Sequence, residues 1–215
     1  RIEIVDTNKS EWLQILNVLF ESGNSEFTVT DLPGREERQR KSILAKVNKA
    51  LNQTLTSEWQ NFRLDNTDAL EVNIDYEEEG KSPNKRSYLR FEVVETDTNK
   101  DKHFFFIRDR SKGFYWFFNF VMRLEFNPKT VAGTELGAVY LLDEPGSYLH
   151  ASAQEKLCKK LRQLSSDNVV IYCTHSHQLL NPDVIPFNTI MVAQKESEGD
   201  IKLVPIYSHR GSILD

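Results

Sequence analysis

The sequence of 215 residues has few cysteines and no long hydrophobic run. Its two cysteines, Cys158 and Cys173, are too few for a disulfide framework and are typical of a reducing compartment, so we expect a cytoplasmic protein. No apolar stretch approaches the roughly 18 residues that a membrane-spanning helix needs. We expect no signal peptide at the start of this sequence.

An excess of positive charge is also missing. The net charge is −5 and the isoelectric point is about 5.6, so the surface has no general attraction for nucleic-acid phosphates, and any DNA contact needs a local basic patch. Hydrophobic residues make up 39% and charged residues 27%, which indicates a globular chain. The chain begins at Arg1 rather than Met, which we interpret as a fragment or a processed product.

The first hundred residues predict an α+β region, which we interpret as an arm or inserted lobe spanning residues 1–100. Apolar residues at helical spacing predict two helices, and alternating apolar residues predict antiparallel strands. The predicted elements are helices over 10–20 and 35–55, turns over 32–34 and 77–85, and strands over 69–76, 87–94 and 103–107. We expect the aromatic strand, with Phe104, Phe105 and Phe106, to lie in the core, and a domain boundary near residue 100.

Helices and strands alternate in the second half, which predicts an α/β fold with a mainly parallel sheet covered on both faces. The predicted helices cover 113–126 and 151–165, and the predicted strands cover 138–143, 169–174, 189–193 and 201–207. Phe114, Phe117, Phe118 and Val121 share one face of the first helix, which favours a buried helix over a platform for stacking bases. Cys158 and Cys173 are predicted to be small core residues.

One strand ends in two adjacent carboxylates. Residues 139–142 are apolar, and Asp143, Glu144 and Pro145 follow directly. A helix start of the type Asp-Glu-Pro is the alternative, but the apolar run favours a buried strand with acids at its mouth. We expect Asp143 to hold Mg²⁺ through water and Glu144 to orient or deprotonate an attacking water.

Two further segments carry candidate chemistry. Ser111, Lys112 and Gly113 precede an apolar helix, where free N–H groups and the helix dipole favour a phosphate, although this segment taken without its neighbours indicates only an N-cap. The strand over 169–174 ends at His175, which could contact a terminal phosphate at the same sheet edge as the acids. A solvated histidine, or a metal site formed by Cys173, His175 and His177, are the alternatives.

Taken in order, these segments resemble the C-terminal half of an ABC-type ATPase head. The resemblance covers about residues 104–195 and is nearest to the branch with the overcoming-lysogenization-defect (OLD) nucleases and the RecF/SMC-like AAA ATPases. Residues 110–117 resemble the signature motif, residues 141–150 resemble the Walker B motif and D-loop, and residues 171–176 resemble the switch-histidine strand. The resemblance implies a P-loop NTPase lobe over residues 101–215.

The resemblance also implies ATP and Mg²⁺ as cofactors and a second ATPase head as partner. Asp143, Glu144 and His175 would act in one head, while Ser111, Lys112 and Gly113 of a facing head would contact the γ-phosphate. ATP would then hold a head dimer that controls a DNA-directed activity, such as an OLD-type nuclease in phage defence or repair.

The sequence contains no Gly-x-x-x-x-Gly-Lys-Ser/Thr phosphate loop. We therefore expect hydrolysis only together with a segment that supplies this loop. A non-catalytic, ATPase-like interaction module is the alternative function, and a metal-dependent hydrolase built on Cys173, His175 and His177 is a third.

Overall fold

The computed structural model describes residues 1–5, 10–23, 26–62, 71–81, 83–96, 100–127, 137–196 and 199–208. The chain divides into two compact units, Arg1–Ala138 and Val139–Asp215. The boundary predicted near residue 100 lies inside the first unit, between two strands that pair with each other. The predicted lobe over 101–215 therefore does not coincide with one compact unit.

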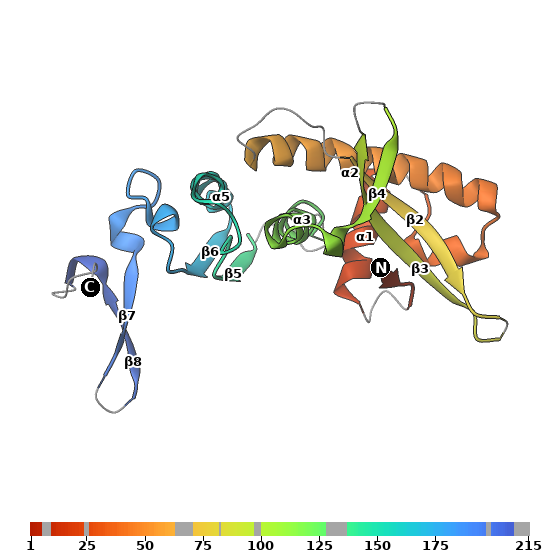
Figure 1. Ribbon diagram of the computed structural model, residues 1–215. Coiled ribbons are helices and arrows are strands. Elements are labelled where there is room, and N and C mark those ends of the chain that lie inside the picture. Colours follow the sequence, from red (N-terminus) through yellow and green to blue (C-terminus); the bar gives the residue numbers. More distant parts are fainter. Residues whose placement is uncertain are drawn as a thin grey trace. The chain divides into compact units, whose positions relative to one another are not determined.

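The first unit combines helices with an antiparallel sheet (Figure 1). Its elements are β1 (Ile2–Glu3), α1 (Glu11–Ser22), the 3-10 helix η2 (Val29–Gly34), α2 (Glu37–Phe62), β2 (Glu71–Glu79), β3 (Arg86–Thr96), β4 (Lys102–Phe106), the 3-10 helix η3 (Ile107–Asp109) and α3 (Lys112–Glu125). The predicted helices and strands are all present. Helix α2 continues past residue 55 to Phe62, and β2 continues through residues predicted as a turn.

Ion pairs explain why β2 continues into its acidic end. Arg90 of β3 pairs with Glu77, and Lys85 lies 2.6 Å from Glu78, so cations beside the strand offset its glutamates. The chain reverses at Gly80, whose φ of 88° lies in the left-handed region that glycine adopts without steric cost. The predicted turn over 77–85 is thus confined to its second half.

Strand β3 is the centre of the sheet, with β2 on one side and both β1 and β4 on the other. Two asparagines of α2 bond to the backbone of β2. Asn52 accepts the Val72 N–H and donates to the Val72 carbonyl at 2.7 and 2.8 Å, and Asn48 does the same with Ile74 at 2.7 and 3.0 Å. These bonds satisfy backbone groups of β2 that β3 does not reach, and they fix α2 along the strand.

The aromatic helix α3 is buried as predicted. Phe114, Phe117, Phe118 and Val121 are at most 6% exposed, and the Phe117 ring lies 4.7 Å from the ring of Trp59 in α2. The prediction for Phe104–Phe106 is wrong, because these residues are 54, 39 and 40% exposed. Among the described strands β4 pairs only with β3, and its phenylalanines remain exposed although the strand is apolar.

The second unit contains the predicted βαβ arrangement. Its elements are β5 (Val139–Asp143), α5 (Ala151–Leu164), β6 (Val169–Cys173), the 3-10 helices η4 (His177–Leu180), η5 (Phe187–Thr189) and η6 (Ile206–Ser208), and the antiparallel pair β7 (Met191–Lys195) and β8 (Ile201–Pro205). Strands β5 and β6 are parallel, with Asp143 opposite Cys173. The described part of the parallel sheet has these two strands.

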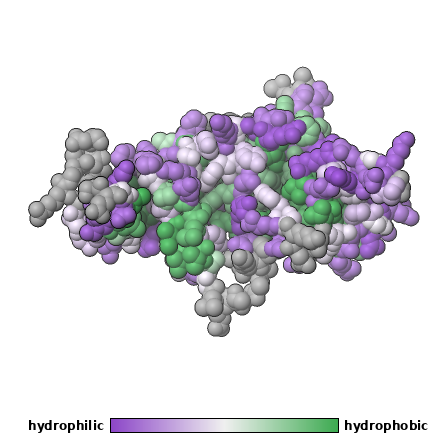
Figure 2. Space-filling model, turned by 90° about the horizontal axis from the view of Figure 1, so that it is seen from below, coloured by the Kyte–Doolittle hydropathy of each residue, from purple (hydrophilic) through white to green (hydrophobic). Residues whose placement is uncertain are grey.

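The prediction that both faces of this sheet are covered is wrong for the described residues. Exposed and half-buried side chains alternate along β5 and β6. On the half-buried side, the Tyr172 hydroxyl donates to the Leu179 carbonyl of η4, and burial raises the pKa of Tyr172 to about 12. On the open side, the exposed apolar side chains are Val139, Leu141, Val169 and Ile171. Figure 2 shows a patch of hydrophobic surface, in green, between hydrophilic regions on the face of the molecule in view.

None of the helices in the described ranges is both long and apolar enough to cross a lipid bilayer.

Candidate functional site

The predicted convergence of Asp143, Glu144 and His175 is found at one edge of the β5–β6 sheet. Because the strands are parallel, their carboxyl ends lie side by side. The His175 Nε2 atom lies 3.5 Å from Glu144 Oε1, and the His175 backbone N–H donates to Glu144 Oε2 at 3.4 Å. The His175 side chain is 99% exposed and that of Glu144 is 35% exposed, so a ligand can reach both.

Glu144 has a strained backbone. Its φ is 45°, in the left-handed region that side chains other than glycine adopt at a cost of about 1–3 kcal/mol. Its N–H donates to the Cys173 carbonyl at 3.0 Å, and its own carbonyl accepts the Ser147 N–H at 3.2 Å. These bonds hold the residue between β6 and the following turn. Such strain concentrates at functional sites, which makes Glu144 a candidate for one.

The turn after Glu144 favours a glycine at position 146. Gly146 has a φ of 74°, and a Cβ atom there would lie 2.6 Å from Leu157 Cδ2 in α5. The Gly146 carbonyl accepts the Leu149 N–H at 2.8 Å. The turn therefore lies directly against α5.

The prediction for the cysteines is right for Cys158, which is fully buried, and wrong for Cys173, which is exposed. Strand alternation puts Cys173 on the open face opposite Asp143, and its Sγ lies 2.9 Å from Asp143 Oδ1. The thiol donates to the carboxylate, and this hydrogen bond raises the pKa of Cys173 above its ordinary value.

This raised pKa predicts the behaviour of an Asp143→Asn variant. Without the carboxylate the pKa of Cys173 falls, so at pH 8 more thiolate is present and Cys173 reacts about three- to tenfold faster with a disulfide reagent. The rate is measured with metal-free protein, and mass spectrometry separates Cys173 from buried Cys158. Asp183→Asn, at an exposed position of the same unit, is the matched control. An unchanged rate in Asp143→Asn would refute the hydrogen bond as the cause.

The metal-site alternative finds no support in the described residues. They contain no group of three or more His, Cys, Asp or Glu side chains that could hold a metal ion. The alternation that predicted a shared face for Cys173, His175 and His177 ends with β6 at Cys173, and His177 begins the 3-10 helix η4. Mg²⁺ bound by one carboxylate, water and a nucleotide is a different kind of site, because it does not need a cluster of protein ligands.

Ser111, Lys112 and Gly113 lie together at the start of α3 in the first unit, whereas Asp143, Glu144 and His175 lie in the second. Ser111 is the N-cap of α3, and its Oγ accepts the Phe114 N–H at 3.2 Å. The N-cap interpretation is thus confirmed. The nucleotide contacts of these three residues stay a prediction.

Gln154 is a further residue of this region that the sequence patterns above did not predict. This residue of α5 is 9% exposed; its Nε2 donates to the Gly146 carbonyl at 2.9 Å, and its Oε1 accepts the Ser176 hydroxyl at 2.7 Å. Helical spacing could have revealed it, because Gln154 precedes buried Leu157 by three positions and buried Leu161 by seven.

Gly80-Lys81-Ser82 matches only the end of a phosphate-loop motif. Asp75 stands where the motif needs its first glycine, and residues 75–79 belong to strand β2 instead of a loop before a helix. This segment therefore does not replace the phosphate loop.

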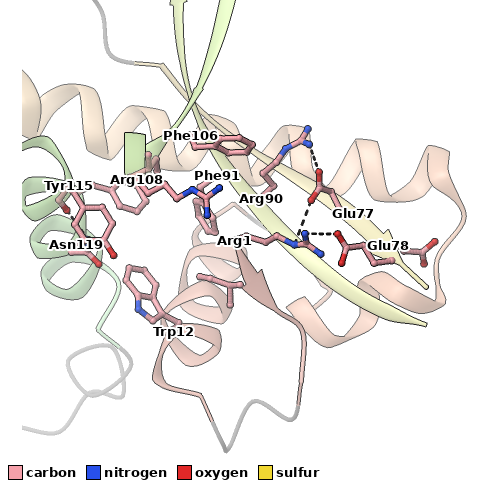
Figure 3. Close-up of a pocket in the computed structure, with 14 residues that line it drawn as sticks. Arg1, Trp12, Glu77, Glu78, Arg90, Phe91, Phe106, Arg108, Tyr115 and Asn119 are labelled. Atoms are coloured by element: carbon pink, nitrogen blue, oxygen red, sulfur yellow. Dashed lines mark hydrogen bonds and ion pairs between the residues drawn. The ribbon is translucent and has the colours of Figure 1, made fainter. Parts of the chain in front are cut away.

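A cavity in the first unit has a volume of about 870 Å³ (Figure 3). Its apolar lining comes from five aromatic residues and two isoleucines: Trp12, Phe91, Phe106, Tyr115, Phe118, Ile2 and Ile107. Three arginines and three glutamates also line it, and Arg1 lies 2.6 Å from Glu79. Because cations and anions balance, the cavity has no surplus positive charge for a phosphate.

Residues 9–181 match the protein family described as "AAA domain, putative AbiEii toxin, Type IV TA system". The matched range contains all six predicted site residues. An uncharacterized protein of Methanocaldococcus jannaschii, MJECL43, is 30% identical over 115 residues, which cover 53% of this chain and 30% of the relative. The chain thus matches less than a third of that relative's length.

SMC heads are among the similar solved structures. One, from a study of ATP-driven dimerization and DNA-stimulated activation of SMC ATPases, has a TM-score of 0.47 and 15% identity, covering 76% of this chain and 88% of that chain. The Smc head domain of Pyrococcus furiosus bound to the C-terminal domain of ScpA has a TM-score of 0.45 and 16% identity, covering 78% and 37%.

Proposed function

The chain belongs to the AAA-domain family that residues 9–181 match, and we propose that it forms part of an ATP-binding and ATP-hydrolysing head. The observation that carries this proposal is the Glu144 carboxylate, which a strained backbone holds beside His175 at the carboxyl ends of two parallel strands. An open sheet edge of this kind is where ligands bind in α/β folds.

Each residue of this edge has a role that its geometry supports. Glu144 orients or deprotonates the attacking water, and exposed His175 contacts the terminal phosphate. Asp143 suits Mg²⁺, since its carboxylate is exposed and carboxylate oxygens are ligands that Mg²⁺ prefers. The Cys173 thiol donates to only one of the two oxygens, Oδ1. Mg²⁺ would neutralise charge on the phosphates when it is bound.

A second head completes the site in this proposal. Ser111, Lys112 and Gly113 would contact the γ-phosphate across a head dimer. Their place at the first turn of the 14-residue helix α3 supports this role, because free N–H groups and the helix dipole favour an anion there. ATP would then hold the two heads together.

The open face of β5 and β6 supports a partner segment that carries the phosphate loop. Leu141 and Ile171 are 74 and 57% exposed, yet parallel strands are normally covered on both faces. A segment that adds strands and a helix here would cover this apolar surface and bring a phosphate loop into the same fold.

The test is to coexpress the chain with a segment that contains Gly-x-x-x-x-Gly-Lys-Ser/Thr, taken from the adjoining coding sequence or a neighbouring gene. We expect a stable complex, Mg²⁺-dependent ATP turnover, and an ATP-dependent doubling of mass in light scattering. A stable complex with an intact phosphate loop that does not bind ATP would refute the proposal.

We propose that the ATP-bound head dimer controls an activity directed at DNA, as in an OLD-type nuclease of phage defence or repair. The resemblance of residues 110–117, 141–150 and 171–176 to that branch supports this proposal. The family description, which names a toxin of a type IV system, supports a link to an effector activity.

A non-catalytic interaction module is the second candidate, because the 215 residues contain no phosphate loop. It predicts that neither the gene nor its neighbours encode such a loop, and that Asp143→Asn and His175→Ala leave the chain's interactions unchanged.

A further inference from the structure

Gln154 is the one polar side chain that is buried in the described part of the chain. A buried amide is tolerated where its donor and acceptor both find partners. Gln154 meets this condition with one partner in each of two loops, the Gly146 carbonyl and the Ser176 hydroxyl. Its side chain therefore joins the turn after β5 to the loop after β6.

These two loops carry the residues of the proposed site. Glu144 lies two positions before Gly146, and His175 lies directly before Ser176. The direct contact between Glu144 and His175 is long, at 3.4 and 3.5 Å, and the imidazole is 99% exposed. Exposed contacts of this kind hold side chains weakly, so the buried Gln154 bridge is better suited to fix the two loops against each other.

Ser176 extends the bridge on one side. Its hydroxyl lies 3.0 Å from Gln178 Oε1, and its backbone N–H donates to Thr174 Oγ1 at 3.0 Å. The Ser176 hydroxyl thus bonds the loop that carries His175 to α5, next to the contact that Cys158 of α5 makes with the Leu179 carbonyl of η4. On the other side, Gly146 packs closely against Leu157 of α5, so the turn that carries Glu144 also contacts α5.

We propose that Gln154 is a positioning residue that holds the Glu144 turn and the His175 loop at one spacing, so that both side chains face the same terminal phosphate. This inference rests on the proposed ATPase function. Gln154 touches neither nucleotide nor water in this scheme and acts through Gly146 and Ser176.

The main test is Gln154→Met, which keeps the length of the side chain but removes both hydrogen bonds. In the complex with the phosphate-loop segment, we expect kcat to fall about 10- to 100-fold with little change in KM for ATP, because the phosphate loop supplies most of the binding. Gln163→Met is the matched control, since Gln163 is exposed on the same helix and should change neither constant.

Ser176 provides a second variant should Gln154→Met fold poorly. Ser176→Ala removes one end of the bridge and should lower kcat, whereas Ser176→Thr retains the hydroxyl and should preserve most of the activity. Equal kcat for Ser176→Ala and the unsubstituted complex would contradict the proposal.

A double substitution separates positioning from a general structural role. If Gln154 acts through the site, Gln154→Met should cause at most about a twofold further loss in a His175→Ala background. An equal loss in both backgrounds would refute positioning. If neither His175→Ala nor Glu144→Gln lowers turnover, the proposed function itself fails.

Amide hydrogen exchange of the 215-residue chain tests the bridge without any nucleotide. Gln154→Met should raise exchange in both segments, 144–149 and 174–178, while Gln163→Met should raise it in neither. Faster exchange in only one segment would refute the link between the loops.

Discussion

Replacement of Glu144 by Gln is expected to lower ATP turnover by about 10²- to 10⁴-fold while ATP still binds. The amide has nearly the same size and can still contact His175, but it cannot accept a proton from water. The strained backbone at φ 45° does not change, so the loss reports the carboxylate's chemistry. Turnover is measured in the complex with the phosphate-loop segment, and ATP binding with a fluorescent nucleotide.

Glu155→Gln is the control for this variant, because it removes one negative charge from an exposed position of α5 in the same unit. It should retain normal turnover. Because hydrolysis releases the head dimer in the proposed scheme, Glu144→Gln should also prolong the ATP-bound dimer. Normal turnover in Glu144→Gln would remove Glu144 from the role assigned to it.

Replacement of Phe117 by Ala is expected to lower the free energy of unfolding of the first unit by about 3–5 kcal/mol. Phe117 is fully buried, and its ring lies 4.7 Å from Trp59 and 6.5 Å from Phe114. The truncation leaves a cavity between α2 and α3 that these rings cannot fill without leaving their own contacts.

Tryptophan fluorescence in a urea titration measures this loss specifically. All three tryptophans, Trp12, Trp59 and Trp116, belong to the first unit, so their signal reports that unit alone. Tyr115→Ala is the control, since Tyr115 is 51% exposed on the same helix and should cost far less. Equal losses for the two variants would show that α3 is not packed as described.

The α-helices of both units and the strands other than β1 followed from local sequence patterns. Apolar residues at helical spacing identified α1, α2 and α3, and alternation identified β2 and β3, because these periods are properties of the backbone. The meeting of Glu144 and His175 was also predictable, since two adjacent parallel strands bring their carboxyl ends to the same edge.

The burial of side chains was predicted less well, because it depends on which residues pack against each face of a strand. Phe104–Phe106 are as apolar as a core strand, yet β4 is exposed among the described residues. Cys173 was expected inside and lies beside Asp143 instead, because alternation assigns a residue to a face without saying which face is covered.

By itself, the sequence determined the α-helices and the longer strands, the order of the motifs and the approach of Asp143, Glu144 and His175. Only the tertiary structure decided that β5 and β6 keep an open apolar face, that Glu144 adopts a left-handed backbone and that Gln154 bridges two loops. The physical reason is the separation along the chain of the residues that set each feature. Periodicity is set within a few residues and the parallel order of β5 and β6 by the helix that connects them, whereas burial and side-chain bridges depend on which residues the fold brings together.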